Sequence, residues 1–376
     1  MTNARKDRIR GEATRLLAAG VAGRVFPGGT ACVAYRESAK DGTRDVYVEA
    51  AAGRLQEGGP NVEIGTPYDL ASITKPFVAM LALRLIVEGK ITLDTRADSL
   101  LSDTRGGAGG PATLEQLLTH RAGLSPWGGL YLDVPHEPGT SAARRWIVGE
   151  ASRRPDETGA ARKQLAVYSD LGYLIAGEML ARASGGTLDR ALQTYVLEPL
   201  GIAEEIYYAG ALSADKKANL IRRAAPTERC EWRGRLVRGE VHDENAAALG
   251  GVAGNAGLFG TAKGVATFGR AILDVLHGRS SFLPKESLEE ALAERPGGTY
   301  RLGWDTRSAE GSSAGKRLSA KSFGHLGFTG TSLWCDPEKD VVVVLLTNRV
   351  HPSRANDRIK GFRPAFHDGV LAALEG

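Results

Sequence analysis

Ser72 and Lys75 stand three positions apart at the start of an apolar segment, and this arrangement limits the possible folds more than any other feature of the chain. Residues at positions i and i+3 share one face of a helix, so the spacing places an amine beside a hydroxyl. Residues 77–87 are apolar apart from one arginine, which predicts a helix that is buried on most sides. Pro76 falls in the first turn, where its missing N–H is tolerated, and Gly89 is suited to cap the C-terminal end.

A serine hydroxyl is a poor nucleophile at neutral pH unless a neighbouring base accepts its proton. A lysine accepts that proton only where its surroundings lower its pKa well below the usual value of about 10.4. The Ser-x-x-Lys pattern recurs at Ser213 and Ser313, but neither of these serines is followed by an apolar helix. Ser72 is therefore the candidate nucleophile, and the alternative is that it only caps a core helix.

The composition excludes several other classes of protein. The 376 residues, 42% of them hydrophobic, allow one large two-lobed domain or two domains. The net charge of +4 comes from 48 basic and 44 acidic residues that are spread along the chain, so no nucleic-acid partner is implied. The 3 cysteines are widely spaced and contain no Cys-x-x-Cys, so neither disulfides nor a zinc site is predicted.

No apolar run is long enough to span a membrane, and the start of the chain lacks the apolar segment of a signal peptide. We therefore expect a cytoplasmic protein. An exported form whose signal peptide has been removed is the alternative.

The order of the predicted elements indicates a sheet that is interrupted by a long helical region. The predicted strands cover residues 30–36, 45–51, 300–306, 322–334 and 341–347, and the helices between them cover residues 113–120, 171–182, 187–200 and 263–276. Residues 341–347 are a continuous apolar run, as expected of a central strand. The segment 125–163 is rich in Pro, Gly and Arg and is predicted to be an irregular loop that shapes a cleft. Amphipathic helices are predicted at both ends of the chain. Strands at both ends around a helical middle predict a sheet domain with a helical insertion.

Three groups of residues that are far apart in sequence carry the candidate chemistry. They are Ser72 with Lys75, Tyr168 just before a predicted helix, and His325-Leu326-Gly327 near the start of a C-terminal strand. With these motifs in this order, the chain resembles the serine β-lactamase and penicillin-binding-protein superfamily. The resemblance covers roughly residues 25–370 and is nearest to the branch that holds class C β-lactamases, D-stereospecific peptidases and related carboxylesterases.

The resemblance implies an α/β fold of the β-lactamase/transpeptidase-like class, in which an antiparallel sheet is flanked by terminal helices and carries a large, mostly helical insertion. Residues 1–70 and 298–376 are expected to form the sheet lobe and residues 71–297 the mainly helical lobe, with the active site in the cleft between them. No metal and no organic cofactor is implied. The stretch 242–245 resembles a loop near the cleft, and metal binding there is a weak alternative for want of ligand spacing.

By this resemblance Ser72 is the acylated nucleophile, Lys75 the proton acceptor and relay, and Tyr168 the second proton carrier. Tyr168 is expected to act as a phenolate base whose pKa is lowered by adjacent positive charge. Asp170 stands where the class C pattern has asparagine. If it is ionised it holds Lys75 charged, which favours Tyr168 as the base; the alternative is that Asp170 caps the helix that follows.

The third motif departs from the usual Lys-Thr-Gly of the superfamily. His325 replaces the lysine and is expected to support Tyr168 electrostatically, although a structural role is the alternative. Leu326 removes a hydroxyl that often helps to bind a substrate carboxylate. Gly327 is retained and lets the substrate lie close to the strand, and the backbone N–H of Phe328, with that of Ser72, is expected to form the oxyanion hole.

These expectations define a serine hydrolase that acts through an acyl-enzyme on ester or amide bonds of a small-molecule or peptide substrate. Without the lysine charge and the threonine hydroxyl, simple esters or amides are predicted to be better substrates than penicillins or D-Ala-D-Ala peptides. The alternative is a penicillin-binding or sensor-like protein that uses the same pocket without turnover. Trp127, Asn348 and Arg349 are further candidates for the walls of the site, while His120 is expected to lie in the core or behind the site.

Overall fold

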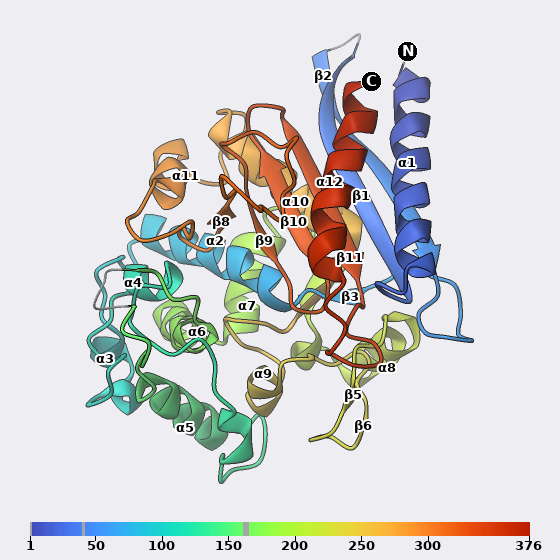
Figure 1. Ribbon diagram of the computed structural model, residues 1–376. Helices are drawn as coiled ribbons and strands as arrows, with labels where there is room; N and C mark the ends of the chain where they lie inside the picture. Colours follow the sequence, from blue (N-terminus) through green and yellow to red (C-terminus); the bar gives the residue numbers. More distant parts are fainter. Residues whose placement is uncertain (1, 40–41, 161–164) are drawn as a thin grey trace.

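A computed structural model describes residues 2–39, 42–160 and 165–376 of the chain (Figure 1). Six strands form one antiparallel sheet in the order β2-β1-β11-β10-β9-β8. Their bounds are β1 Gly28–Ala39, β2 Gly42–Gly53, β8 Asp305–Thr306, β9 Phe323–Leu326, β10 Ser332–Asp336 and β11 Val341–Thr347. Strands from the two ends of the chain are neighbours in this sheet, since β1 pairs with β11 and Val33 lies opposite Val343.

Helices cover both faces of the sheet. The terminal helices α1 (Thr2–Ala22) and α12 (Ile359–Glu375) lie side by side on one face, and α10 (Ala262–Leu276) packs against the other (Figure 1). In β11, Val341, Val343 and Leu345 join the core under the terminal helices, whereas Val342, Val344 and Leu346 join the core shared with α10. Successive side chains of a strand point to opposite faces, so burial on both faces explains the continuous apolar run. The predicted fold class is confirmed.

The middle of the chain is mainly helical and lies beside the sheet (Figure 1). Its helices are α2 Thr74–Val87, α3 Ala97–Leu100, α4 Leu114–Leu118, α5 Ser141–Ser152, α6 Asp170–Ser184, α7 Leu188–Leu192, α8 Ala214–Arg223, α9 Glu244–Ala248 and α11 Lys285–Leu292. Short strands β3 Tyr68–Asp69, β7 Leu258–Gly260 and β4 Ile206–Tyr208 form a second sheet, and β5 Arg229–Cys230 pairs with β6 Arg235–Leu236. Within the described ranges, no helix is both long enough and apolar enough to cross a membrane.

Helix α2 is the buried centre of the helical region, as its sequence predicts. Of its 14 residues 11 are buried, and Phe77 stacks on Phe268 of α10 with 3.8 Å between ring centroids. Gly89 has a positive φ of 67° and its N–H donates to the carbonyl of Ile86, which ends the helix. The helix therefore connects the residues at its N-terminal end, which include Lys75, with α10 on one face of the main sheet.

The segment 125–163 was expected to be an irregular loop, and this expectation is wrong for its central part. Helix α5 begins after Thr140, whose hydroxyl accepts a hydrogen bond from the N–H of Ala143. Ala143, Ile147 and Ala151 are fully buried and share one face, on which α5 packs against α6. The Pro, Gly and Arg residues around the helix mask this periodicity in the sequence. Residues 161–163 of the predicted loop lie outside the described residues.

Two predicted strands are shorter than expected. Residues 300–306 form a strand only at β8, and residues 322–334 contain the whole of β9, a turn and the start of β10. The turn is closed by hydrogen bonds from the N–H of Gly327 to the carbonyl of Thr331 (2.8 Å) and from the N–H of Gly330 to the carbonyl of Gly327 (3.1 Å). This turn brings Gly327 and Phe328 to the site.

The two-lobe division at residues 70 and 298 stays a prediction. Two observations bear on it. The larger core joins residues of the sheet, such as Val342, with residues of the helical region, such as Leu174. Helix α10, whose residues fall in the predicted helical lobe, packs against β1 and β11. The sheet layer therefore includes a helix from the middle of the chain.

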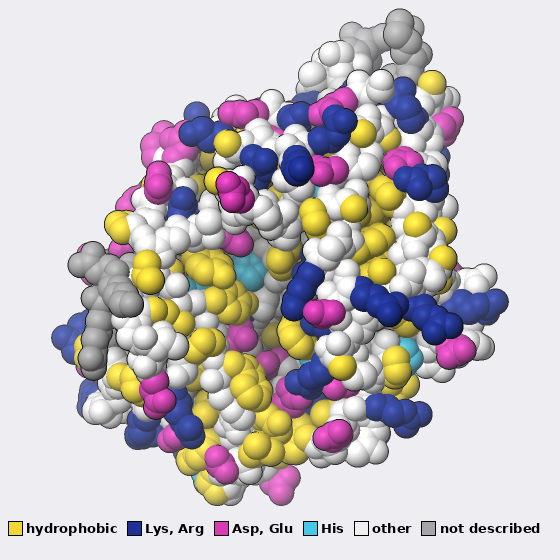
Figure 2. Space-filling model, viewed as in Figure 1, with side chains coloured by type: hydrophobic (Ala, Val, Ile, Leu, Met, Phe, Trp, Pro, Cys, Tyr) yellow, Lys and Arg dark blue, Asp and Glu magenta, His cyan; other side chains and the backbone are white. Residues whose placement is uncertain are grey.

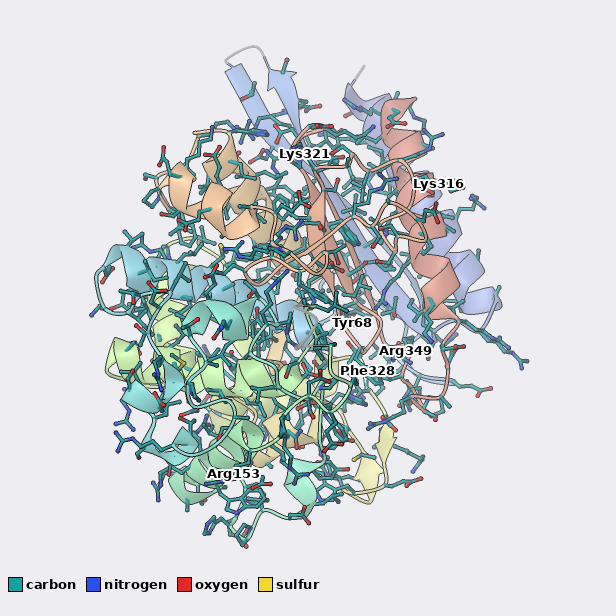
Figure 3. The ribbon with its side chains drawn as sticks, turned by 60° about the vertical axis from the view of Figure 1, so that its left-hand side comes forward. Tyr68, Arg153, Lys316, Lys321, Phe328 and Arg349 are labelled. Atoms are coloured by element: carbon teal, nitrogen blue, oxygen red, sulfur yellow. The ribbon has the colours of Figure 1, made fainter. Side chains whose placement is uncertain are left out.

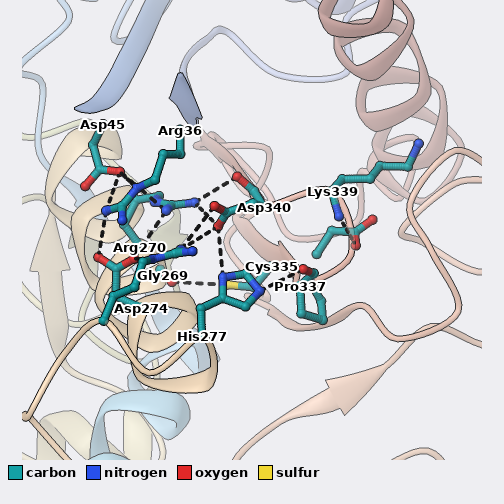
Figure 4. A network of polar contacts seen from close by, with 12 residues as sticks. Arg36, Asp45, Gly269, Arg270, Asp274, His277, Cys335, Pro337, Lys339 and Asp340 are labelled. Carbon is teal, nitrogen blue, oxygen red and sulfur yellow. Dashed lines mark hydrogen bonds and ion pairs between the residues drawn. The ribbon is translucent and has the colours of Figure 1, made fainter. Parts of the chain in front are cut away.

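Arg270 on α10 stands at the centre of an ion-pair network behind the sheet (Figure 4). Its guanidinium lies 2.8 Å from the carboxylate of Asp340 in the β10–β11 turn, 3.3 Å from Asp45 on β2 and 3.4 Å from Asp274 on its own helix. The Arg270 side chain is 1% exposed, whereas that of Arg279 in the same network is 29% exposed. The network joins the β-hairpin, α10 and the central strands.

Arg270→Met is expected to lower the free energy of unfolding by about 3 kcal/mol, because it removes the buried counter-ion of three carboxylates. Urea denaturation at neutral pH measures the loss. The matched control is Arg279→Met, which removes a more exposed partner of two of these carboxylates, Asp274 and Asp340, and should cost less than about 1 kcal/mol. Equal losses for the two variants would contradict the central place of Arg270.

Candidate active site

The side chains of Ser72, Lys75 and Tyr168 meet at one point, as the resemblance implies. The Nζ of Lys75 donates to Ser72 Oγ at 2.9 Å, and the phenol of Tyr168 donates to the same oxygen at 2.7 Å. Ser72 lies in the single turn (residues 71–73) that precedes α2, and Tyr168 lies just before α6. Both groups lie within proton-transfer distance of Ser72 Oγ, so whichever of them is deprotonated can accept the proton of the serine.

The backbone before Ser72 is held in an unusual conformation. Ala71 has a positive φ of 48°, which is rare for a residue with a side chain. The N–H of Ala71 donates to Asp69 Oδ1 at 2.8 Å, and the hydroxyl of Thr331 donates to the carbonyl of Leu70 at 3.1 Å. The other carboxylate oxygen of Asp69 accepts the N–H of His242 at 2.6 Å. These contacts hold the turn that carries Ser72 in its strained conformation. Strained backbone of this kind is common at functional sites.

Lys75 is fully buried and its ammonium has three acceptors. Besides Ser72, Nζ donates to Asp170 Oδ1 at 2.6 Å and to the backbone carbonyl of Asn255 at 3.1 Å. Burial lowers the pKa of Lys75, and the negative charge of Asp170 opposes this shift. Of the two roles considered for Asp170, contact with Lys75 is observed. The cap of α6 is Ser169, whose hydroxyl accepts the N–H of Gly172.

The expected lowering of the Tyr168 pKa is wrong. Burial raises the pKa of Tyr168 well above its usual value, and the charge of Asp170 raises it further. The ammonium of Lys75 lies 5.0 Å from the centre of the Tyr168 ring, and its hydrogen bonds among the described residues go to Ser72, Asp170 and Asn255. The rings of His120 and Tyr300 enclose Tyr168 at 4.5 Å and 5.6 Å. Tyr168 is therefore a neutral phenol in this state of the protein.

His325 does not supply the positive charge that was expected of it. Burial, assisted by the charge of Lys75, lowers the pKa of His325 to about 3. Its Nδ1 lies 2.8 Å from the carbonyl of Leu326, which can only accept, so Nδ1 carries the proton of the neutral ring. The ring centre lies 6.1 Å from that of Tyr168. His325 is a buried neutral side chain behind Tyr168.

Gly327 is required by the protein itself. A Cβ at this position would lie 2.0 Å from the hydroxyl of Thr331 and 2.6 Å from the carbonyl of Leu70. Glycine thus allows the chain just after β9 to pack against the turn that carries Ser72. The motif predicted a glycine for the approach of substrate, but packing within the protein already requires one.

The side chain of Phe328 is half exposed, and the guanidinium of Arg349 stacks 4.4 Å from its ring centre (Figure 3). Its ring also stacks on His242 at 5.6 Å. No described residue accepts a hydrogen bond from the backbone N–H of Phe328. Phe328 and Ser72 line the same cavity.

That cavity has a volume of about 540 Å³. Figure 2 shows it as a central hollow with hydrophobic side chains along one rim and basic side chains along the other. The hydrophobic lining includes Pro126, Trp127, Ala256, Leu326, Phe328 and Ile359, and the charged lining includes Asp170, Asp243, Glu244, Arg349, Arg354, Asp357, Lys360 and Arg363. Of the predicted wall residues, Trp127 and Arg349 line the cavity. Asn348 does not, because its amide donates to the carbonyls of Leu55 and Pro226.

Sequence reasoning missed Asn255 and Arg363. Asn255 follows a run of glycines without a catalytic pattern, and Arg363 has the pattern of an ordinary basic residue on an amphipathic helix. For His120, the sequence predicts a position in the core or behind the site. Its Nδ1 accepts the N–H of Ser169, next to Tyr168, at 3.0 Å. Within the described ranges, no cluster of His, Cys, Asp and Glu is arranged to hold a metal ion, and this applies to 242–245 as well.

The chain is similar to several known proteins. A putative D-alanyl-D-alanine carboxypeptidase of Salmonella agona is 26% identical over 333 residues, which is 82% of this chain and 74% of the relative. An N-acetylmuramyl-L-alanine amidase of Bacillus subtilis is 27% identical over 315 residues, 76% of this chain and 68% of the relative. The crystal structure of a penicillin-binding-protein homologue from Caulobacter crescentus has a TM-score of 0.70 and 19% identity, with 98% of each chain covered. The Beta-lactamase family model matches residues 13–363, so the chain belongs to this family of serine hydrolases.

Proposed function

We propose that the protein hydrolyses ester or amide bonds through an acyl-enzyme formed on Ser72. The single observation that carries the proposal is the contact of Ser72 Oγ with both Lys75 and Tyr168 beside a cavity of about 540 Å³. The names of the Salmonella and Bacillus relatives add peptide amides to the substrates worth testing. We further propose that the site lies in the cleft between one lobe of residues 1–70 and 298–376 and another of residues 71–297; the cavity lining, which draws on both, supports this.

Acylation begins when Ser72 Oγ attacks the carbonyl carbon and its proton passes to Lys75. Lys75 suits this role because burial lowers its pKa, whereas Tyr168 stays a neutral phenol. The electron pair of the carbonyl π bond moves to oxygen, where the N–H groups of Ser72 and Phe328 stabilise the charge. When the bond to the leaving group breaks, the phenol of Tyr168 protonates the departing atom and is reprotonated by Lys75.

Deacylation repeats these steps with water in place of the serine. A water molecule gives a proton to Lys75 as its oxygen attacks the acyl carbon, and the acid leaves as Ser72 Oγ regains a proton. Each cycle consumes one water and returns Ser72, Lys75 and Tyr168 to their starting states. No metal or organic cofactor takes part in these steps.

Intact-mass measurement after incubation with a fluorophosphonate tests the nucleophile. The wild type is expected to gain one adduct mass and Ser72→Ala none. A wild type without adduct, or an equal adduct on Ser72→Ala, would refute the proposal. An adduct with no turnover of any ester or amide would support the alternative of a penicillin-binding or sensor-like protein.

Simple esters are predicted to be better substrates than penicillins. Leu326 offers no hydroxyl to a substrate carboxylate, and His325 is neutral. The buried Arg349 and Arg363 donate to backbone carbonyls of the protein. We therefore expect kcat for p-nitrophenyl butyrate to exceed kcat for benzylpenicillin by at least about tenfold, equivalent to about 1.4 kcal/mol. Faster turnover of benzylpenicillin under saturating conditions would contradict this prediction.

A further inference from the structure

Arg363 on α12 contacts the peptide unit that carries one of the two proposed oxyanion donors. The Gly327–Phe328 peptide has the carbonyl of Gly327 at one end and the N–H of Phe328 at the other. Arg363 Nη2 donates to that carbonyl at 2.6 Å and to the carbonyl of Thr331 at 2.8 Å. No mechanistic step described above uses this guanidinium.

The contact is not needed to satisfy the two carbonyls. Gly327 O already accepts the N–H of Gly330 at 3.1 Å, and Thr331 O already accepts the N–H of Gly327 at 2.8 Å. The turn between β9 and β10 thus keeps its backbone hydrogen bonds without Arg363. Stabilising this turn therefore does not explain why the guanidinium is there.

Burying this guanidinium is also energetically unfavourable. Arg363 is 7% exposed, and no carboxylate of the described chain lies within ion-pair distance of it. Its Nε has no hydrogen-bond partner among the described residues. Burial and the charge of Arg349 lower the pKa of Arg363 to about 9. A buried cation without a counter-ion is destabilising, so its presence beside the site calls for a function.

We propose that Arg363 is a positioning residue of the oxyanion hole, which orients and polarises the Gly327–Phe328 peptide through its carbonyl. A charge-assisted hydrogen bond to a carbonyl draws electron density from the amide, and this makes the N–H of the same peptide a stronger donor. The donor of Phe328 then binds the developing oxyanion more strongly than an unassisted amide does. Arg363 itself does not touch the substrate oxygen. This inference rests on the proposed function, because it needs Ser72 to form a tetrahedral intermediate.

The role predicts a defect in the transition state and not in substrate binding. Arg363→Met is expected to lower kcat for p-nitrophenyl butyrate by about tenfold to a hundredfold, somewhat less than the loss of a whole oxyanion donor, with KM changed less than twofold. The dissociation constant of an alkyl boronic acid, which binds as a tetrahedral anion, should rise by the same factor as kcat/KM falls. Arg363→Lys keeps a charge that can reach one carbonyl and should recover part of the loss.

The test counts active sites before it compares rates. Each variant is titrated with a fluorophosphonate, and kcat is expressed per titrated Ser72, so that misfolded protein does not enter the comparison. Values of kcat per titrated site within twofold of the wild type for Arg363→Met would overturn the inference. If that variant does not fold, the same criterion applies to Arg363→Lys, whose boronic acid affinity must then be lower than that of the wild type. A wild type that takes up no fluorophosphonate refutes the proposed function instead, so the two failures are distinguishable.

Discussion

Ser72→Ala is expected to lower kcat/KM for p-nitrophenyl butyrate by at least about 10⁴-fold, equivalent to about 5.5 kcal/mol of transition-state stabilisation. The substitution removes the atom that Lys75 and Tyr168 both contact, so no acyl-enzyme can form. The oxyanion donors and the cavity stay in place, and a residual rate above that of the uncatalysed reaction should remain. Steady-state kinetics with protein purified from a host that lacks esterase background measure the loss.

The fold of this variant should not change. Ser72 lies before α2, whose backbone hydrogen bonds and buried apolar residues do not involve the Ser72 hydroxyl. A thermal midpoint within about 3 °C of the wild type would show that the loss of activity is chemical, since this shift corresponds to only roughly 2 kcal/mol in a chain of 376 residues. Activity within tenfold of the wild type would mean that another residue is the nucleophile.

The fold class was predictable because its signals are local and strong. The apolar run of β11, the burial of α2 and the order of strands and helices follow from periodicity, and the resemblance supplied the class of fold. The shape of α5 was hidden by the Pro and Gly residues around it. The break between β9 and β10 was hidden as well, because residues 322–334 have the pattern of one strand unless the turn at Gly327 and Gly330 is recognised.

The positions of the site residues were predictable, but their protonation states were not. Contact among Ser72, Lys75 and Tyr168 follows from the motifs, whereas a pKa depends on burial and on the direction from which a charge approaches. Burial raises the pKa of Tyr168 and lowers that of His325, and neither effect can be read from a motif. The sequence did not predict a role for Arg363, because the proposed role depends on its contact with one carbonyl in the distant β9–β10 turn.

Replacement of Lys75, the proposed base, is expected to have the other large effect on the rate. Lys75→Met is expected to lower the rate of acylation by about 10³- to 10⁴-fold, because it removes the group whose pKa is shifted toward neutrality and leaves Tyr168 with a raised pKa. Tyr168→Phe keeps Lys75 in contact with Ser72 and should cost only about 10- to 100-fold. Methionine is similar in length to lysine, so it occupies most of the buried space that the Lys75 side chain fills.

The pH dependence distinguishes the two side chains. The free amine of Lys75 is the base, so the acylation rate should rise as pH rises through the lowered pKa of Lys75 in the folded protein. Tyr168→Phe should keep this rise and Lys75→Met should lose it. Pre-steady-state kinetics with p-nitrophenyl butyrate between pH 5 and about 10 measure the acylation step directly; the upper limit lies near the unperturbed lysine pKa. If Tyr168→Phe is the slower variant and loses the pH dependence, a Tyr168 phenolate is the base, and the electrostatics of the resting site do not govern the reaction.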